Sequence, residues 1–272
     1  MSFYTSLSGV KAAQTDLAVI SNNLANVGST GFKKSRAQFG DLFANSPVQA
    51  PKMRAGQGTR LNAVVQQFTQ GTLETTDKNM DLAIAGDGFF VTRGDAPKNA
   101  VTYTRNGAFQ VNNNRQVVDT IGSTLQLLPV DANGVPLSTT LASATDFVLP
   151  TASPTDPNIP LVDVSIDIDG LVTATYADGT DQMLGKIAMA GFTAPEGLRQ
   201  IGDSHWQATG ESGAPDIDAP NLGTVRAGAL ERANVDVTEE LVALISAQRN
   251  FQANAKAIET ASNMTQAIVA IR

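Results

Sequence analysis

The sequence predicts a mixed α and β fold, with N- and C-terminal helices that pair as a coiled coil and a central β-rich body made from the segment between them. Apolar residues recur every three or four positions in residues 1–32 and again in residues 231–272, and each of these patterns predicts a helix. A third observation predicts the body: within residues 60–230, short runs of β-branched and aromatic residues alternate with Gly, Asn and Asp turn signals.

The first segment is a candidate helix without a charged back face. Before Phe32, only Lys11 and Asp16 carry side-chain charge, and Ser, Thr, Asn and Gln take most of the remaining positions. Its apolar positions are Phe3, Leu7, Val10, Ala13, Leu17, Ile20, Leu24 and Val27. We therefore expect neighbours to cover this helix on more than one side. The helix should end near Gly28, because glycine and asparagine tolerate the positive φ of a helix C-terminus.

The last segment is a longer candidate helix that begins at Asp236. Asp236 followed by Glu239 has the spacing of a capping box, with aspartate as the cap. The expected seam positions are Val237, Leu241, Leu244, Gln248, Phe251, Ala255, Ile258, Ala261, Met264, Ile268 and Ile271. Two arrangements of the terminal helices follow from this pattern: a hairpin within one copy, or packing between copies. The scarcity of charge favours packing between copies, because little of either helix is suited to water.

Residues 33–59 are expected to form a linker or an extended arm. The part up to Phe43 is expected to be a short helical or irregular piece, and Pro47 and Pro51 favour an extended chain after it.

Turn signals place several strands of the body. Asn106-Gly107 between apolar arms predicts a β-hairpin over residues 103–109. A further turn is expected at residues 112–114. Asp169-Gly170 and Asp178-Gly179 divide the next alternating stretch into three strands of a β-meander. Residues 131–160 are rich in Pro, Ser, Thr and Asp, so they are expected to be loops on the outer surface.

Composition excludes several classes of protein. Of the 272 residues, 42% are hydrophobic, which suffices for a core, and the absence of cysteine excludes disulfides and thiolate metal sites. No apolar run approaches the roughly 18 residues of a membrane span, so no direct membrane insertion is expected. No basic stretch precedes an apolar one at the N-terminus, so any export is expected to proceed without a cleavable signal peptide.

The net charge of −7 is concentrated in the middle of the chain. Between residues 140 and 220 twelve acidic residues stand against Lys186 and Arg199. An acidic body repels phosphates, which argues against a nucleic-acid partner. The basic cluster at Lys33, Lys34 and Arg36 is too short for a nucleic-acid site and is interpreted as a solvated or interface patch.

No catalytic, cofactor-binding or metal-ligating residue is predicted. Asp203-Ser204-His205 contains triad residue types, but residues this close in sequence do not ordinarily converge as nucleophile, base and orienter, so His205 is interpreted as a structural or surface residue. Residues 165–170 approach a calcium-loop pattern, but Tyr176 takes the position of its last ligand, and a turn at Asp169-Gly170 fits better. Gly86-Asp-Gly88 lacks the third glycine of a dinucleotide site and is expected to mark a tight turn or bulge.

Several motifs occur together and in order along the chain. They are Ser21-Asn-Asn-Leu-Ala-Asn26, Ser29-Thr-Gly-Phe-Lys33, Gln67-Phe-Thr-Gln-Gly71, Asp81-Leu-Ala-Ile-Ala-Gly-Asp-Gly-Phe-Phe90, Tyr103-Thr-Arg-Asn-Gly-Ala-Phe109, Gly228-Ala-Leu-Glu231, Asn234-Val-Asp236 and Gln248-Arg-Asn-Phe251. In this combination the chain resembles the bacterial flagellar rod, hook and hook-associated axial proteins, and a short-form hook subunit most of all.

The resemblance implies a structural role and an arrangement in layers. The terminal helices, residues 1–32 and 231–272, would form an inner layer around a central export channel, and residues 60–230 an outer domain. The chain would polymerise helically into the hook, a curved flexible tube that transmits torque from rod to filament. Residues implied to form the subunit interface are Leu7, Val10, Leu17, Ile20, Leu24, Val27, Leu241, Leu244, Phe251, Ile258 and Ile268. Residues implied to shape the turn after the first helix are Asn22, Asn23, Asn26, Gly31 and Phe32.

The same resemblance implies partners and a location. The partners would be further copies of the chain, the distal-rod protein, the hook cap protein, the hook–filament junction protein and the flagellar export apparatus. The location would be the hook or basal body, outside the cell after type III export, and no enzymatic activity is expected.

Two alternatives to the hook remain. The first is a distal-rod subunit. The short segment from Phe43 to Gly58 and the ending Ala-Ile-Val-Ala-Ile-Arg favour the hook. The rod-like length of the chain and the small size of the region 131–160 favour the rod. The second is a β-rich extracellular binding module, for which one tryptophan and three tyrosines supply few aromatic side chains.

Overall fold

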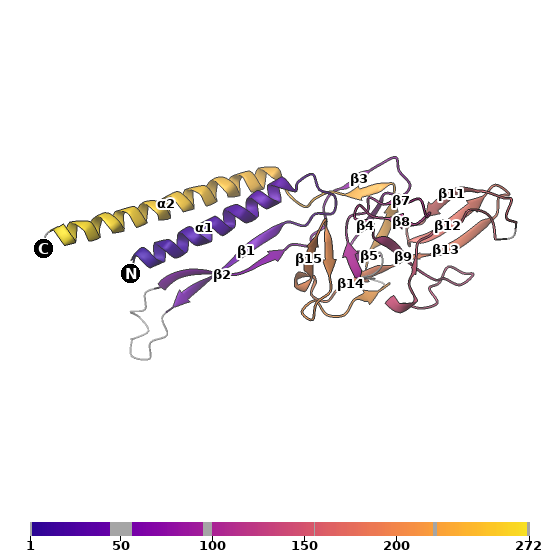
Figure 1. The fold of residues 1–272 in the computed structure, drawn as a ribbon, viewed down its shortest axis with the longest axis horizontal. Helices are drawn as coiled ribbons and strands as arrows, with labels where there is room; N and C mark the ends of the chain where they lie inside the picture. Colours follow the sequence, from indigo (N-terminus) through magenta and orange to yellow (C-terminus); the bar gives the residue numbers. More distant parts are fainter. Residues whose placement is uncertain (1, 44–55, 95–99, 155, 220–221, 271–272) are drawn as a thin grey trace. The chain divides into compact units, whose positions relative to one another are not determined.

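A computed structural model describes residues 2–43, 56–94, 100–154, 156–219 and 222–270. The chain divides into two compact units. The helical unit contains residues 1–27, 34–67 and 235–272, and the β-rich unit contains residues 28–33 and 68–234. The fold is therefore mixed α and β, as the sequence predicted, with the first and last segments in one unit and most of the strands in the other (Figure 1).

Two antiparallel helices, α1 (Ser2–Ala25) and α2 (Val237–Ala270), lie side by side in the helical unit (Figure 1). Gly9 faces Asn254, and a Cβ at Gly9 would lie 2.6 Å from the Asn254 Oδ1. At the other end Asn23 contacts Glu240. The missing side chain at Gly9 thus lets α2 approach α1 closely. Because α2 is ten residues longer than α1, its last turns extend past the first residue of α1.

The predicted cap of α2 is present. The Asp236 Oδ1 accepts hydrogen bonds from the backbone N–H groups of Thr238 at 2.7 Å and Glu239 at 3.2 Å. These bonds lower the pKa of Asp236 below its usual value. The carboxylate of Glu239, which a capping box would direct at the backbone of Asp236, instead pairs with the Lys34 Nζ at 3.1 Å.

A two-stranded antiparallel ribbon completes the helical unit. Strand β1 (Ser35–Phe43) pairs with β2 (Gly56–Gln66), starting with Ser35 opposite Gln66. The expectation of a helical or irregular piece up to Phe43 is therefore wrong, because the hydrogen bonds that hold β1 come from a strand that begins more than ten residues later. The part of the expected arm from 44 to 55, which includes Pro47 and Pro51, lies outside the described residues.

A thirteen-stranded sheet system dominates the β-rich unit. Its main path runs in the order β11-β12-β13-β9-β5-β6-β16-β15, and two separate pairs, β18-β4 and β19-β3, complete the unit. The strands are β3 (Leu73–Thr75), β4 (Leu82–Ala85), β5 (Phe89–Arg93), β6 (Val101–Thr104), β7 (Gln110–Val111), β8 (Val117–Val118), β9 (Thr124–Leu128), β10 (Thr145–Asp146), β11 (Leu161–Ile166), β12 (Leu171–Tyr176), β13 (Asp181–Ile187), β14 (Met189–Gly191), β15 (Arg199–Gly202), β16 (His205–Gln207), β17 (Asp216–Ile217), β18 (Thr224–Ala227) and β19 (Ala229–Glu231).

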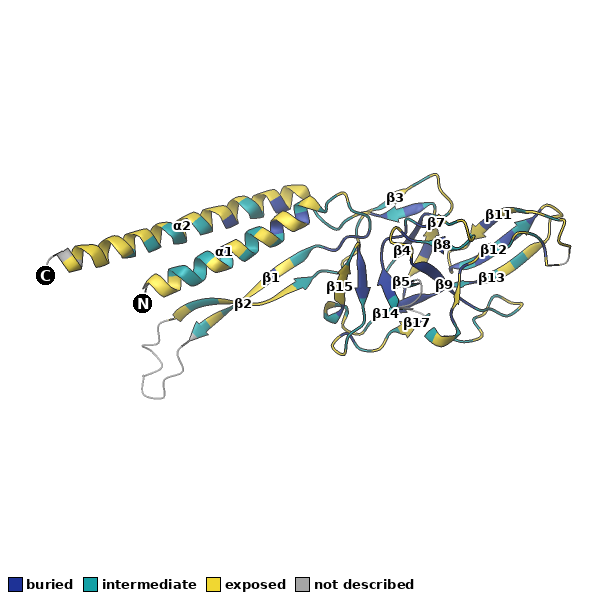
Figure 2. Cartoon of the chain, viewed as in Figure 1, coloured by how far each residue is buried: buried dark blue, intermediate teal, exposed yellow. Residues whose placement is uncertain are grey.

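The core of the β-rich unit lies between these strands. Figure 2 shows the buried residues gathered on the central strands, such as β5 and β9, where Phe90, Val91 and Leu125 are fully buried. In the described part of residues 131–160 the elements are short, namely the 3₁₀ turn Leu141–Ser143 and strand β10. They are nevertheless not entirely surface loops, because Phe147 is fully buried in the core.

The predicted meander is confirmed. Strands β11, β12 and β13 pair in sequence as antiparallel neighbours. Gly170 and Gly179, in the two turns, adopt φ angles of 78° and 79°, which glycine reaches without strain. The turn at residues 112–114 is also present, between the paired strands β7 and β8.

The predicted hairpin over residues 103–109 is wrong. Strand β6 pairs with β5 and β16, not with the segment that follows Gly107. A type I′ turn needs positive φ at both central residues, and neither Asn106 nor Gly107 has it. Gly107 instead permits a close backbone approach, because a Cβ there would lie 1.5 Å from the Leu82 carbonyl oxygen.

Candidate assembly surfaces

Most residues of the predicted interface set are buried or half-buried within the helical unit. Ile20 is buried, as are Ala13, which the sequence analysis placed on the apolar face of the first helix, and Ala247, which it did not name. The half-buried members are Leu7, Val10, Leu17, Leu24, Val27, Leu244, Phe251 and Ile258. Leu241 is 44% exposed, so it belongs only to the edge of the expected seam. The side chain of Ile268 lies outside the described part of the chain.

Both helices also carry apolar side chains that neither helix covers. On α2, Val242 is 61% exposed, Met264 is 62% exposed and Val269 is 75% exposed, and on α1 Tyr4 is 74% exposed. The exposed side of α2 is the yellow face in Figure 2. The sequence analysis did not predict Val242 because it assigned one apolar face to the C-terminal helix. Val242 and Ile245 are three residues apart, and this helical spacing was the signal for a second apolar face.

Asn23 joins three elements of the helical unit. Its Oδ1 accepts a hydrogen bond from the Ser35 N–H at 2.9 Å, and its Nδ2 donates to the Ser35 carbonyl at 2.9 Å. The same Nδ2 lies 3.3 Å from the Glu240 Oε2 of α2. Because Asn23 is buried, its amide fixes the start of β1 against both helices.

The other residues of the predicted turn have separate positions. Asn22 and Asn26 close the end of α1, where the Asn26 Nδ2 donates to the Asn22 carbonyl at 2.9 Å. Gly31 and Phe32 belong to the β-rich unit and are buried there. Gly31 has a φ of 67°, and a Cβ would lie 2.6 Å from the Arg105 backbone, so a side chain there is both strained and obstructed.

A buried ion cluster, which the sequence reading did not find, lies in the β-rich unit. The Glu231 Oε1 accepts from the Lys33 Nζ at 2.7 Å and from the Gly71 N–H at 2.8 Å, and its Oε2 accepts from Arg105 at 3.2 Å. The side chains of Lys33, Glu231 and Arg105 are at most 2% exposed. Burial lowers the pKa of Lys33, and the charge of Glu231 opposes that shift. Lys33 is therefore part of an internal ion cluster, which corrects its interpretation as part of a solvated or interface patch.

His205 is a structural residue and is completely buried. Its Nδ1 lies 2.7 Å from the Asp203 carbonyl oxygen, which can only accept, so Nδ1 carries a proton. Its Nε2 lies 2.7 Å from the Asp119 Oδ2. Both ring nitrogens are therefore held by groups inside the core, and Ser204 donates to the Thr30 carbonyl instead of to the histidine. Asp203, Ser204 and His205 do not form a catalytic triad.

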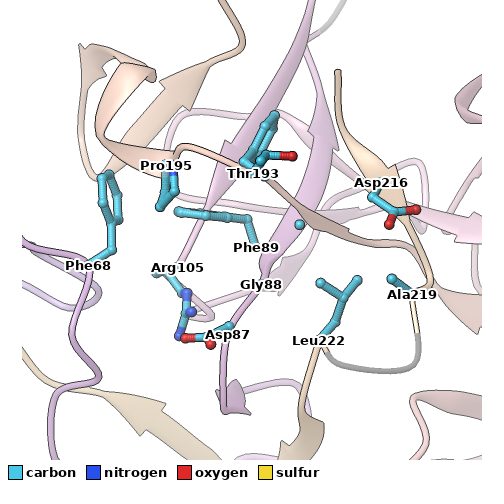
Figure 3. Close-up of a pocket in the computed structure, with 12 residues that line it drawn as sticks. Phe68, Asp87, Gly88, Phe89, Arg105, Thr193, Pro195, Asp216, Ala219 and Leu222 are labelled. Carbon is cyan, nitrogen blue, oxygen red and sulfur yellow. The ribbon is translucent and has the colours of Figure 1, made fainter. Parts of the chain in front are cut away.

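An aromatic pocket of about 360 Å³ opens in the β-rich unit. Figure 3 shows Phe68, Phe89 and Pro195 around the pocket, and Arg105 and Asp87 also line it. The Phe89 ring meets the rings of Phe68 and Phe192 edge to face, with centroids 5.5 Å and 5.8 Å away. The remaining lining residues are Gly88, Gly191, Thr193, Asp216, Ala219 and Leu222.

Among the described residues, no three His, Cys, Asp or Glu side chains gather closely enough to hold a metal ion. No helix in the described ranges is long and apolar enough to cross a membrane.

Three family models match the chain. Residues 3–33 match the flagella basal body rod protein model, and residues 83–174 match the flagellar hook protein FlgE/F/G D1 domain. Residues 226–271 match the C-terminal model of the flagellar basal body rod FlgEFG proteins. The first and third of these cover the two helices, and the second covers part of the β-rich unit.

Relatives that align over nearly the whole chain indicate the same family. The flagellar basal-body rod protein FlgG of Buchnera aphidicola subsp. Baizongia pistaciae is 33% identical over 275 residues, which cover 95% of this chain and 94% of that protein. FlgG of Bacillus subtilis is 33% identical over 288 residues, covering 100% and 98%. The flagellar hook protein FlgE of Escherichia coli is 28% identical over 413 residues, covering all of both chains.

Among solved structures, the flagellar hook protein FlgE2 of Helicobacter pylori aligns with 53% of this chain and 38% of its own at 15% identity. Its TM-score of 0.26 is too low for this alignment to support an argument. The sequence relatives and family models suffice: the chain belongs to the flagellar rod and hook family that includes FlgE, FlgF and FlgG.

Proposed function

We propose that the chain is a structural subunit that polymerises helically through its terminal helices into a tube of the flagellar axis. The observation that supports this most is the apolar surface left on the paired helices. Val242 is 61% exposed on the part of α2 that runs beside α1, and Met264 and Val269 are more than 60% exposed on the turns of α2 that extend past the start of α1. Further copies of the helical unit would remove this surface from water, and each Å² of apolar surface buried would contribute roughly 25 cal/mol.

The hook is the first candidate tube, on the resemblance described above. The distal rod is the second, and the alignment lengths favour it. The FlgG relatives align with this chain over 275–288 residues, close to its own 272, whereas the alignment with the hook protein needs 413 positions. The hook protein therefore has long segments that this chain lacks.

The partners follow from the same proposal. A tube subunit contacts copies of itself first, and the distal-rod, hook cap and hook–filament junction proteins and the export apparatus at the ends or during assembly. Neither an enzymatic activity nor a cofactor is part of the proposal.

Electron microscopy of the purified full-length chain tests the proposal. We expect tubes from the wild type, and no tubes or a much higher concentration threshold from Val242→Glu and Met264→Glu, because each places a charge where a second copy should lie. Gln252→Glu is the matched control: it adds the same charge at an exposed polar position of α2 and should still assemble.

Each outcome decides a part of the proposal. Curved tubes indicate the hook and straight tubes the distal rod. If the charged variants assemble at the wild-type threshold, the exposed helix face is not an interface between copies.

A further inference from the structure

The aromatic pocket of the β-rich unit presents rings to a side chain that enters it. Phe68, Phe89 and Phe192 are among the residues that line it, and the Phe89 ring also meets the buried Trp206 ring edge to face, with 5.6 Å between centroids. Aromatic rings attract a further ring in the same edge-to-face or an offset arrangement. The pocket volume of about 360 Å³ lies at the low end of ligand pockets, of order 300–1,000 Å³. An aromatic side chain is therefore the occupant that this lining favours.

The accessible charge of the pocket is negative. Asp87 and Asp216, which form its acidic rim, are exposed, and among the described residues no hydrogen-bond donor reaches either carboxylate (Figure 3). The guanidinium of Arg105 also lines the pocket, but it is 2% exposed and donates to Glu231, so it offers little surface to an occupant. A carboxylate accepts hydrogen bonds and cannot donate them. The pocket therefore favours an occupant that carries a donor and no negative charge.

Tyr4 is the exposed side chain that meets these requirements. The chain has three tyrosines and one tryptophan, and Tyr103, Tyr176 and Trp206 are all buried. Tyr4 is 74% exposed in the first turn of α1, so it is the one exposed ring of the chain that carries an O–H donor. Residues 2–10 contain no charged side chain, so no carboxylate beside Tyr4 opposes the acidic rim.

Other exposed apolar side chains meet fewer of the requirements. Phe3 and Phe39 are only 42% and 38% exposed and have no polar atom for the acidic rim. Val269 is 75% exposed and Leu137 is 69% exposed, but each is aliphatic and supplies neither a ring nor a donor.

We propose that Tyr4 of one copy inserts its ring into the aromatic pocket of the next copy and donates its phenol O–H to a carboxylate of the acidic rim. Tyr4 belongs to the helical unit and the pocket to the β-rich unit, so the contact joins two different surfaces. A contact of that kind leaves a free Tyr4 and a free pocket at the two ends, and it continues into a ring or a helical polymer. The inference rests on the proposed polymerisation and names one contact within it.

The absence of cysteine makes the contact directly testable by cross-linking. Phe3→Cys places a thiol beside Tyr4, and Thr193→Cys places one at an exposed position of the pocket lining. The two full-length variants are mixed under assembly conditions and treated with a short bismaleimide, so only a link between copies joins positions 3 and 193. We expect this covalent dimer. The matched control is Phe3→Cys combined with Tyr4→Ala, which keeps the thiol and removes the ring, and its dimer yield should be about tenfold lower.

Two further variants separate the ring from its hydroxyl group. Tyr4→Ala should raise the concentration needed for assembly about tenfold, and Tyr4→Phe should raise it by a smaller factor, because it keeps the ring and loses only the donor. In a chain with Asp87→Ala and Asp216→Ala, which lacks the acidic rim, Tyr4→Phe should cause no further change. A Tyr4→Phe effect that persists in that chain overturns the assigned hydrogen bond.

The outcomes separate the contact from the polymer. Absence of the 3–193 link in well-formed tubes, or equal linking by the Tyr4→Ala control, overturns the pocket contact and leaves the helix-driven polymer intact. A 3–193 link that depends on Tyr4 in chains that never form tubes supports the contact and contradicts the polymer. Chains that neither link nor form tubes contradict both. Circular dichroism checks that Tyr4→Ala keeps both helices, as expected for a side chain that is 74% exposed.

Discussion

At the scale of single residues, the β-rich unit depends on charge that is hidden from water. Glu231 is the one acidic member of the buried ion cluster, and it compensates Lys33 and Arg105 together. It also accepts from the Gly71 backbone, and the Gly31 N–H donates to its carbonyl at 2.8 Å. One side chain thus joins the segment that follows α1 to the strand that precedes α2. A buried charge retained at such a junction fixes which segments meet, at a considerable cost in desolvation.

Replacement of Glu231 should therefore be severe. Glu231→Gln leaves Lys33 and Arg105 buried without a compensating charge, and we expect the free energy of unfolding to fall by about 3–5 kcal/mol. Urea unfolding followed by the fluorescence of the buried Trp206 measures this in the β-rich unit. The control is Glu74→Gln, which breaks an ion pair with Arg232 that is more than half exposed and should change stability little. Equal midpoints for Glu231→Gln and wild type would contradict the assigned role.

At the scale of elements, local features of both units could be predicted from the sequence, whereas features that depend on distant residues could not. Helix spacing and the Asp236 cap are local, so they could be predicted, as could the turns of the β11–β13 meander. Strand β1 could not, because its partner β2 lies far along the chain and its own nine residues carry no decisive pattern. Asn106-Gly107 misled for a related reason: Gly107 is required by the approach of the distant Leu82 carbonyl, not by a turn. The contacts of Asn23 with Ser35 and Glu240 were equally invisible, although Asn23 itself was singled out.

The Asp236 cap predicts how α2 responds to pH. Backbone N–H donors depress the pKa of Asp236 in the folded state below 3.8, its ordinary value. The cap carboxylate therefore contributes stability that is complete above pH 3.8 and is lost as the pH falls through the depressed, folded-state pKa. Asp236→Asn keeps a capping side chain without the charge. We expect wild type to exceed this variant in thermal stability at pH 7, and the difference to disappear at acidic pH.

Circular dichroism at the helical band measures this response, because both α-helices belong to the helical unit. Asp236→Ala, which removes the cap entirely, should be less stable than either at neutral pH. A wild type that keeps its full advantage over Asp236→Asn below the folded-state pKa would show that the charge of Asp236 does not act through the cap.

At the scale of the whole molecule, family membership rests on comparisons that cover nearly all of the chain. The proposed polymerisation rests on apolar side chains that a single copy leaves exposed. The sequence could predict a body between two terminal helices and a lack of charge on those helices. It could not predict the buried ion cluster or the aromatic pocket, because both bring together residues separated by more than a hundred positions. Apolar surface that one copy does not cover remains on α2.

The most direct test of the central claim is the reactivity of a single thiol on the exposed face of α2. Val242→Cys supplies the only cysteine in the chain, at a position 61% exposed in the single copy. Its rate of modification by a small maleimide is measured in the dispersed protein and in assembled tubes. If copies cover this face, the rate should fall at least about tenfold on assembly. An unchanged rate in well-formed tubes would show that the tube is built without burying this helix face, and the proposed mode of polymerisation would be wrong.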